Sequence, residues 1–560
     1  MKKIIYSFLG MLAILSSCQE PEYVLPTANR QGITSLTAIF VEGEYAEKVA
    51  VEYKISDSSV DKFVIPIPYY YPESSDNETE QYMSKFKVQA ELAPNYQLSP
   101  SLGILDLTKE NYFTLTEPDG TQRKISISGI RKKSSACQLL SFALPDLGVT
   151  GSIDEETKSV ALPTLDELKA TMATYTLSPH ATISPDPAVE NIDYNQPVKF
   201  TVTAHDGTQA VYTVEKKIPE KINYGYRAGS ESLAYTIDLT TNGMPAVSHP
   251  SIAVCGGNLV VNYGDGSTPI YFNAATGGTK LGTVNLGNAT ATGSVTSDTG
   301  GNMLICNYAQ AGESWSLYAT NDVKQEPKKI LSMQNTTSFP VGSRLSVTGD
   351  ISSNAIITSA FDGVGAGSNQ FIRCVVRNGV VGQPEIVTVS GVGYWFAMDA
   401  NAKVAYRTTE VEDGYFVGHY NYNDQLNYVD GTSNTATSAL GAQSDGSGWG
   451  YNNSIVSTTT FNKATYLAFY AVGYFPQWGM NSIFYLYDVS SASGFSGTVD
   501  ATDILKMSSS VKSYNAAEPS EPRTGDILLV PSTNGFKMSL YYVDNTCKTV
   551  GCYNFDCIKK

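Results

Sequence analysis

The side chains that could bind a ligand are concentrated in one aromatic-rich stretch of the sequence. Three of the four tryptophans lie between Trp395 and Trp478, and several aromatic residues in this stretch stand next to Gly, Pro or Asn. Aromatic rings on rigid turns stack against the C–H faces of sugars, while nearby amides and carboxylates bind the hydroxyl groups. The predicted ligand-binding residues are Trp395, Tyr420, Trp449, Tyr451, Tyr474 and Trp478. The alternative is that these rings fill the space between packed sheets.

Residue patterns that carry catalysis are sparse. The histidines are His180, His205, His249 and His419. Their wide spacing matches no metal-binding motif. A two-carboxylate glycosidase would need two acids that converge in space, and Asp350, Asp399 and Glu412 are the first to test, although each is better explained as a turn or solvated residue. We therefore predict a protein that is not an enzyme and that holds no metal and no cofactor.

The cysteines do not predict a disulfide framework. Besides Cys18 there are seven, an odd number scattered along the chain. Cys255, Cys306 and Cys374 lie in apolar, strand-like runs, where buried free thiols are expected. The last three are Cys547, Cys552 and Cys557. One disulfide among them is left open, and a metal site is disfavoured because neither His nor a Cys-x2-Cys pair lies nearby.

The N-terminus has the pattern of a bacterial export signal. Lys2 and Lys3 precede an apolar run, Ile4–Leu15, which ends in Leu15-Ser16-Ser17-Cys18. The run is shorter than the roughly 20 residues of a membrane-spanning helix. Its end resembles the lipobox of bacterial lipoproteins, which implies a signal peptide at 1–17, lipidation of Cys18 and a tether at 18–30. A plain secretory signal is the alternative.

Composition predicts an all-β chain that does not bind nucleic acid. Only 16% of residues are charged, while 47 glycines and 36 tyrosines suit short strands joined by turns. The net charge of −16 argues against a phosphate-backbone partner. The densest basic run of the mature chain is Arg131–Lys133, which we interpret as a solvated linker.

An internal repeat predicts two related β modules, at 31–132 and 133–222. The segment Tyr112–Gln122 returns as Lys199–Gln209, and both carry Asp-Gly-Thr between alternating strands. Asp-Gly in this setting is a hairpin signal, and modules of this length are typically immunoglobulin-like (Ig-like) β-sandwiches. Calcium binding by Asp119 and Asp206 is the alternative to plain turn chemistry.

The remainder, 226–560, predicts a β-propeller. Short strands and Gly-rich turns recur about every 45 to 60 residues, the period of four-stranded blades. Six units are countable, so six blades are favoured and seven are possible. The free strand Ser232–Asp238 could close the ring by joining the last blade, around Lys537–Asn554. A pair of long β-sandwiches is the competing fold.

The order of these parts resembles a group of Bacteroidota-type surface lipoproteins, largely of unknown function. The resemblance is specific at Phe200–Val214, which looks like their Ig-like repeat, and loose across 226–560. It implies a non-catalytic, lipid-anchored protein of the outer membrane, exposed at the cell surface, that captures a glycan in partnership with an outer-membrane importer. The alternatives are a propeller-type polysaccharide hydrolase or lyase and a protein-interaction or adhesion scaffold.

Overall fold

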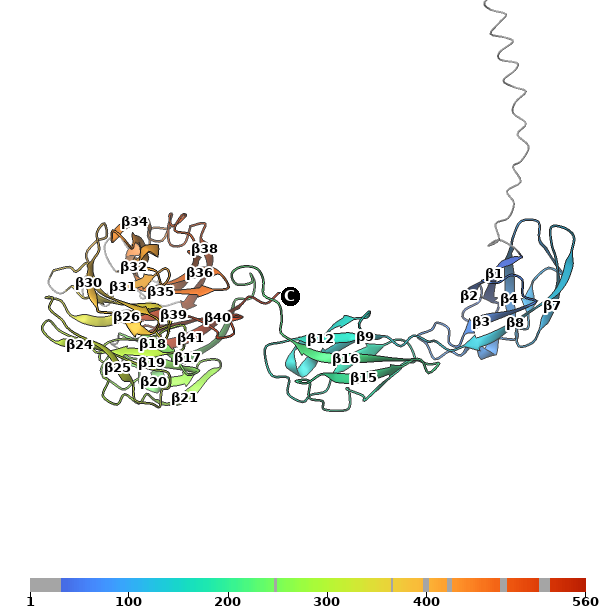
Figure 1. Ribbon diagram of the computed structural model, residues 1–560, viewed down its shortest axis with the longest axis horizontal. Helices are drawn as coiled ribbons and strands as arrows, with labels where there is room; N and C mark the ends of the chain where they lie inside the picture. The colour runs from blue at the N-terminus through green and yellow to red at the C-terminus, as the bar shows by residue number, and fades with distance from the viewer. Residues whose placement is uncertain are drawn as a thin grey trace, which may run out of the picture. The chain divides into compact units, whose positions relative to one another are not determined.

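The chain is built almost entirely of β-strands, which confirms the predicted all-β class. The computed structural model describes residues 32–245, 249–363, 366–395, 402–419, 426–473, 481–512 and 524–559. All helical elements among these residues are short 3-10 turns. None of them is long and apolar enough to cross a membrane. The chain divides into two compact units, Met1–Pro219 and Glu220–Lys560 (Figure 1).

The first part of the N-terminal unit consists of two four-stranded sheets. One sheet has the order β2-β1-β4-β6 and contains β1 (Ile33–Phe40), β2 (Val49–Lys54), β4 (Phe86–Leu92) and β6 (Ile104–Leu105). The other has the order β3-β8-β7-β5 and contains β3 (Lys62–Pro68), β5 (Gln97–Ser99), β7 (Asn111–Thr116) and β8 (Gln122–Lys132). The turn η1 (Thr79–Tyr82) lies between β3 and β4. Alternate residues of these strands, such as Phe113 and Leu115 on β7, form one hydrophobic core.

The second part of the N-terminal unit has a three-stranded and a five-stranded sheet. The first has the order β10-β9-β13, with β9 (Leu139–Leu144), β10 (Val149–Thr150) and β13 (Thr174–Leu177). The second has the order β11-β12-β16-β15-β14, with β11 (Ser152–Asp154), β12 (Ser159–Pro163), β14 (Thr182–Ser184), β15 (Val198–Thr203) and β16 (Gln209–Lys217). The turn η2 (Pro145–Leu147) follows β9.

The two copies of the repeat form the same hairpin, β7–β8 and β15–β16. Asp119 Oδ1 accepts the backbone N–H of Thr121, and Asp206 Oδ1 accepts that of Thr208, both at 2.8 Å. The glycine that follows each aspartate has a positive φ, 88° at Gly120 and 94° at Gly207, which explains the choice of Gly. These aspartates therefore close turns, as plain turn chemistry predicts.

The described residues of the C-terminal unit form six sheets, each with four strands in a row. The first sheet contains β18 (Ser251–Cys255), β19 (Asn258–Asn262), β20 (Ile270–Asn273) and β21 (Gly277–Thr283). The second contains β22 (Val295–Ser297), β23 (Met303–Cys306), β24 (Ser314–Thr320) and β25 (Lys328–Gln334). The third contains β26 (Val341–Gly349), β27 (Ala355–Phe361), β28 (Gln370–Arg377) and β29 (Val380–Val381), and β30 (Glu385–Thr388) also pairs with β28. The fourth contains β31 (Lys403–Tyr406), β32 (Tyr415–Gly418), β33 (Leu426–Asp430) and β34 (Thr435–Leu440). The fifth contains β35 (Tyr451–Phe461), β36 (Ala464–Gly473), β37 (Ser482–Asp488) and β38 (Leu505–Lys512). The sixth contains β17 (Ser232–Asp238), β39 (Gly525–Pro531), β40 (Lys537–Asp544) and β41 (Thr549–Asp556). Three short turns, η3 (Thr240–Asn242), η4 (Val411–Asp413) and η5 (Gly448–Gly450), lie between strands of the unit.

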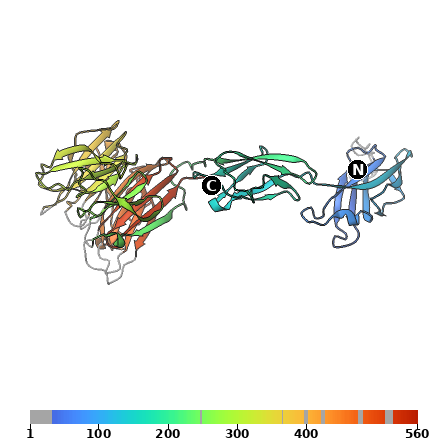
Figure 2. The same cartoon turned by 90° about the horizontal axis from the view of Figure 1, so that it is seen from below.

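The sheets follow one another in cyclic order. One edge strand of each sheet contacts an edge strand of the next, in the order β18, β22, β26, β31, β35, β39 and back to β18. We call these six strands the first strands. Strand β17 comes before all of them in the sequence, yet it pairs antiparallel with β41, so that Ser232 lies opposite Asn554. Figure 2 shows this green strand beside the red strands of the last sheet. The predicted pairing of Ser232–Asp238 with the C-terminal strands is confirmed.

The seven cysteines of the described residues are buried or half-buried thiols. Cys255, Cys306 and Cys374 are fully buried, as expected from their apolar surroundings, and burial raises the pKa of Cys306 to about 11. The question left open for the C-terminal three is answered by the structure, in which Cys547, Cys552 and Cys557 form no disulfide.

Candidate functional site

Two of the predicted ligand-binding aromatics lie in the hydrophobic core. The side chain of Trp395 is fully buried, and its Nε1 donates a hydrogen bond of 2.6 Å to the carbonyl oxygen of Phe361. Tyr451 is 6% exposed and packs with the core that includes Phe416 and Tyr485. Neither ring offers a free face to a sugar, because packing against neighbouring sheets occupies both.

The other predicted residues are not placed by the structure. Tyr420, Tyr474 and Trp478 lie outside the described residues, as does the side chain of Trp449. Cys18 and Asp399 also lie outside them. Of the other two candidate carboxylates, Asp350 accepts the backbone N–H of Ser352 at 2.7 Å in the β26–β27 turn, and Glu412 lies in η4.

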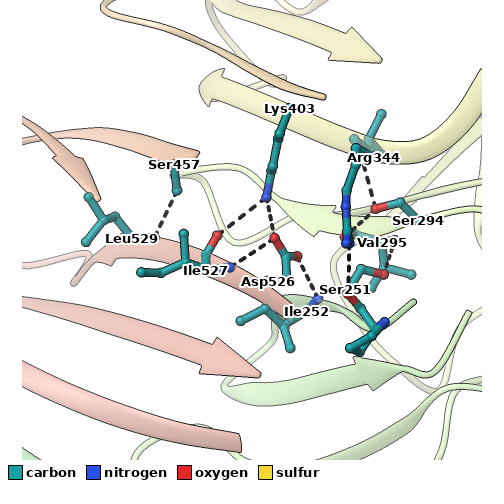
Figure 3. A network of polar contacts seen from close by, with 12 residues as sticks. Ser251, Ile252, Ser294, Val295, Arg344, Lys403, Ser457, Asp526, Ile527 and Leu529 are labelled. Atoms are coloured by element: carbon teal, nitrogen blue, oxygen red, sulfur yellow. Dashed lines mark hydrogen bonds and ion pairs between the residues drawn. The ribbon is translucent and has the colours of Figure 1, made fainter. Parts of the chain in front are cut away.

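A cluster of buried charged side chains lies where first strands of the sheets begin. Arg344 on β26, Lys403 on β31 and Asp526 on β39 are each 2% exposed (Figure 3). Two further titratable groups, His249 just before β18 and Asp362 just after β27, affect the pKa of Arg344 or are affected by it. We call these five residues the charged cluster. β26 and β27 are antiparallel with Val341 opposite Phe361, so Asp362 lies at the same end of its sheet as the start of β26.

Lys403 and Asp526 form a buried ion pair between two sheets. Lys403 Nζ lies 2.5 Å from Asp526 Oδ1, and the backbone N–H of Ile527 donates to the same oxygen at 2.9 Å. The other oxygen accepts the backbone N–H of Ile252 on β18 at 3.1 Å. Burial lowers the pKa of Lys403, and the neighbouring Asp526 opposes this effect. Asp526 therefore joins strands of three sheets through one carboxylate.

Arg344 is a buried cation that contacts neutral acceptors. Its Nη1 donates to the carbonyl oxygen of Pro250 at 3.0 Å, and its Nη2 donates to Thr524 Oγ1. Its Nε is buried without a hydrogen-bond partner. Among the ion pairs of the described residues, none involves Arg344, and burial lowers its pKa. The charges of Asp526 and Asp362 oppose this lowering, but neither carboxylate forms an ion pair with the guanidinium.

The remaining titratable groups of the charged cluster are the side chains of Asp362 and His249. Burial raises the pKa of Asp362 to about 7, although its Oδ1 accepts a hydrogen bond from Ser343 Oγ at 2.8 Å. Its Oδ2 is buried without a partner. Burial and Arg344 lower the pKa of His249 to about 4, so its ring is neutral near pH 7, and its Nδ1 also lacks a partner.

Serine hydroxyls hold the first strands around the charged cluster in register with one another. Ser251 Oγ on β18 accepts the backbone N–H of Val295 on β22 at 2.9 Å. Ser457 Oγ on β35 accepts that of Leu529 on β39 at 3.1 Å (Figure 3). A short polar side chain facing the next strand satisfies a backbone donor that no neighbouring strand reaches. Three members of the charged cluster, Arg344, Lys403 and Asp526, are therefore carried by strands that these contacts join to one another.

The sequence analysis missed the charged cluster. A signal was present, because Lys403-Val-Ala-Tyr406 and Asp526-Ile-Leu-Leu529 each place a charge at the start of an apolar strand. Buried strands seldom tolerate a charge without a partner. Lys403 and Asp526 are more than a hundred residues apart, so their pairing could not be predicted from the sequence.

The basic run Arg131–Lys133 lies at the edge of a cavity in the N-terminal unit. The cavity has a volume of about 270 Å³, and its lining includes Tyr69, Tyr70, Glu73, Lys132, Lys133, His180 and His205. Arg131 is neutralised by Glu78 at 2.7 Å and Glu80 at 3.0 Å. Charges of both signs therefore meet here, and the geometry does not favour an anion site.

Three protein-family models match the chain. The model of a domain of unknown function (DUF8500) matches residues 233–556, which is more than half of the chain and nearly all of the C-terminal unit. This chain belongs to the DUF8500 family. Two further domains of unknown function match the rest, DUF5018 at residues 13–129 and DUF8499 at residues 139–216. No curated protein sequence matches the chain.

Solved structures similar to this DUF8500 protein share little sequence with it. A DUF4623 family protein from Bacteroides eggerthii is 14% identical, with 76% of this chain and 99% of that chain covered and a TM-score of 0.43. The α-L-arabinofuranosidase Arb93A from Fusarium graminearum is 10% identical, with 60% and 98% covered and a TM-score of 0.34. The Bacillus subtilis arabinanase Arb43A is 11% identical, with 45% and 90% covered and a TM-score of 0.26.

Proposed function

We propose that this DUF8500 protein is a non-catalytic, lipid-anchored surface protein that binds an extracellular glycan. Cys18 carries the lipid, the two N-terminal modules are Ig-like sandwiches that act as a stalk, and the C-terminal unit is a six-bladed propeller. The cyclic contacts of the six first strands and the return of β17 to the last sheet support the propeller.

The charged cluster is the observation that carries the binding proposal. Removing a charge from water costs several kcal/mol even after the protein relaxes, and an ion pair offsets this only when its geometry is good. Lys403 and Asp526 meet that condition, whereas Arg344 contacts only neutral groups. Perturbed and incompletely paired groups of this kind gather at functional sites. The end of the sheets at which the first strands begin is therefore the proposed binding face.

A glycan is the proposed ligand because of the aromatic residues in the same unit. Tyr420, Trp449, Tyr474 and Trp478 remain candidates for stacking on sugar rings. An outer-membrane importer is the proposed partner, which would receive the captured glycan.

Binding by the chain without its signal and lipid, residues 19–560, tests the proposal. A glycan array followed by calorimetry should identify a bound glycan, and Arg344→Lys should weaken its affinity at least tenfold because the fork of donors is lost. Arg377→Lys is the matched control, since Arg377 is half-exposed and pairs with Glu410 at 3.1 Å. No binding to any glycan would contradict the proposal. Separately, Cys18→Ala should move the protein from the membrane to the soluble fraction.

A polysaccharide hydrolase is the second candidate, and one observation favours it. Asp362, with a pKa of about 7, could donate a proton, and Asp526 is the second carboxylate of the charged cluster. Against this, both oxygens of Asp526 already accept hydrogen bonds from Lys403 and from backbone N–H groups. Release of reducing sugar by the chain, abolished in Asp362→Asn, would establish the enzyme and overturn the non-catalytic proposal.

A further inference from the structure

We propose that the charged cluster binds the carboxylate of an acidic glycan, such as a uronic acid residue, with Arg344 as the anchor. The inference rests on the proposed function and names the ligand class of that site.

The charges of the cluster leave one positive charge in excess when Asp362 is protonated. Arg344 and Lys403 are cations, Asp526 is the single full anion, and His249 is neutral. Asp526 is committed to Lys403 at 2.5 Å, so the excess charge lies on Arg344. A ligand with one negative charge restores neutrality. A doubly charged phosphate would overcompensate, and a neutral sugar would leave Arg344 unbalanced.

Three buried polar atoms of the cluster lack a hydrogen-bond partner. They are Arg344 Nε, His249 Nδ1 and Asp362 Oδ2. A carboxylate can accept from the guanidinium through its two oxygens, which is the geometry that Arg recognises best. A protonated Asp362 can donate its O–H to the same carboxylate. A ligand carboxylate therefore offers an acceptor to Arg344 Nε and to the O–H of a protonated Asp362.

His249 is the most exposed member of the charged cluster. Arg344 and Asp362 are almost completely buried, whereas His249 is only partly buried. Arg344 contributes to the lowered pKa of His249, so the two side chains are close. A ligand carboxylate that enters beside the His249 ring meets Arg344 first.

Asp362 makes this binding depend on pH. The groups that influence it are Arg344 and Ser343 on β26 and Tyr308 after β23, and of these only Arg344 carries a charge near pH 7. Once Asp362 is ionised, its own carboxylate competes with the ligand for Arg344 and repels it. Affinity for an acidic glycan should therefore fall as the pH rises through about 7.

Calorimetry with residues 19–560 and two matched probes tests the inference. The probes are an oligogalacturonate and a neutral galactan oligosaccharide of the same length, titrated between pH 5.5 and 8.5. We expect preferential binding of the oligogalacturonate and an affinity about tenfold weaker at pH 8 than at pH 6, because only the chain with protonated Asp362 binds. Free galacturonate distinguishes recognition of the acid group alone from recognition of the polymer.

Two variants make the result decisive. Asp362→Asn, which is isosteric and always neutral, should abolish the fall in affinity above pH 7, whereas Asp350→Asn, in the turn at the opposite end of β26, should retain both the affinity and the pH profile of the wild type. Arg344→Lys should lose the preference for the acidic probe. Equal affinity for both probes, or an unchanged pH profile in Asp362→Asn, would overturn the inference and leave glycan binding standing. Failure of both probes together with all glycans of the array would instead overturn the proposed function.

Discussion

Asp362 shows how burial alone changes the chemistry of one residue. Its side chain is fully buried, and burial raises its pKa to about 7 even though Ser343 and Arg344 favour the charged form. An ordinary aspartate in an unfolded chain releases its proton near pH 4. The folded chain therefore keeps a proton that the unfolded chain has lost.

The stability of the C-terminal unit should reflect this difference. Between about pH 4 and pH 7 the folded state binds the extra proton, so the free energy of unfolding contributed by Asp362 falls as the pH rises, and above pH 7 it is constant. Asp362→Asn removes this loss. It should gain about 2 kcal/mol relative to the wild type on going from pH 5 to pH 8, measured by urea denaturation at both values.

Comparing Asp362→Asn with the wild type at the same pH removes the contribution of the other titratable groups to the free energy of unfolding. His249 and His419 both have a pKa lowered to about 4 by burial, and they destabilise the folded state as the pH falls below about 6.5. Both chains share this effect, so it cancels in the difference. The same difference at pH 5 and pH 8 would show that Asp362 titrates normally.

The aromatic residues show what could be predicted at the residue scale. Burial of Cys255 and Cys306 followed from their apolar neighbours in sequence. The burial of Trp395 could not be predicted from the sequence in the same way. Turn residues beside Trp395 in the sequence do not show whether another sheet covers its ring. Trp395 packs in one hydrophobic core with Val404 and Tyr415, which belong to the following sheet.

At the scale of elements, ion pairs and hydroxyl contacts connect the first strands. Lys403 on β31 and Asp526 on β39 belong to sheets that are not neighbours in the cyclic order, and their contact crosses the space enclosed by the first strands. Ser251 and Ser457 connect neighbouring first strands through backbone N–H groups. Polar contacts thus fill the region where first strands converge, whereas apolar side chains fill the spaces between sheets.

Breaking the Lys403–Asp526 pair should be strongly destabilising. Lys403→Met leaves Asp526 buried without a cation, which is expected to lower the free energy of unfolding by about 3 to 5 kcal/mol. Asp526→Asn should have a similar effect because it leaves Lys403 unpaired.

A double-mutant cycle measures the coupling of this pair. The double variant Lys403→Met/Asp526→Asn should be more stable than the sum of the single losses predicts, since neither charge then remains buried alone. Urea denaturation of the four proteins gives the coupling energy. Additive losses would mean that the two charges are stabilised independently.

At the scale of the whole molecule, β17 connects the beginning and the end of the C-terminal unit. It pairs along its length with β41, and Ile237 and Leu239 enter the same hydrophobic core as Val550 and Cys552. We therefore expect the folding of the unit to depend on β17, which comes before all its other strands in sequence.

Truncation before and after β17 tests this dependence. A chain that begins at Glu220 should fold cooperatively, because it retains β17 and the ion pair of Arg227 with Asp556 at 2.8 Å. A chain that begins at Thr240 should lose cooperative thermal unfolding, because the edge of β41 and two core positions are exposed. Circular dichroism melts and size-exclusion chromatography measure both. Equal stability of the two chains would show that β17 is dispensable.

The sequence by itself determined the features that depend on residues close together along the chain. Alternating strands and Asp-Gly turns specify hairpins such as β7–β8 and β15–β16, because side-chain period and turn conformation are local properties. The recurring units and the free strand Ser232–Asp238 indicated six sheets and the partner of β17. Only the tertiary structure decided which side chains are buried between sheets and which charges meet. Arg344, Lys403 and Asp526 come together because three separate sheets begin at the same place, and burial there, not residue type, sets their chemistry.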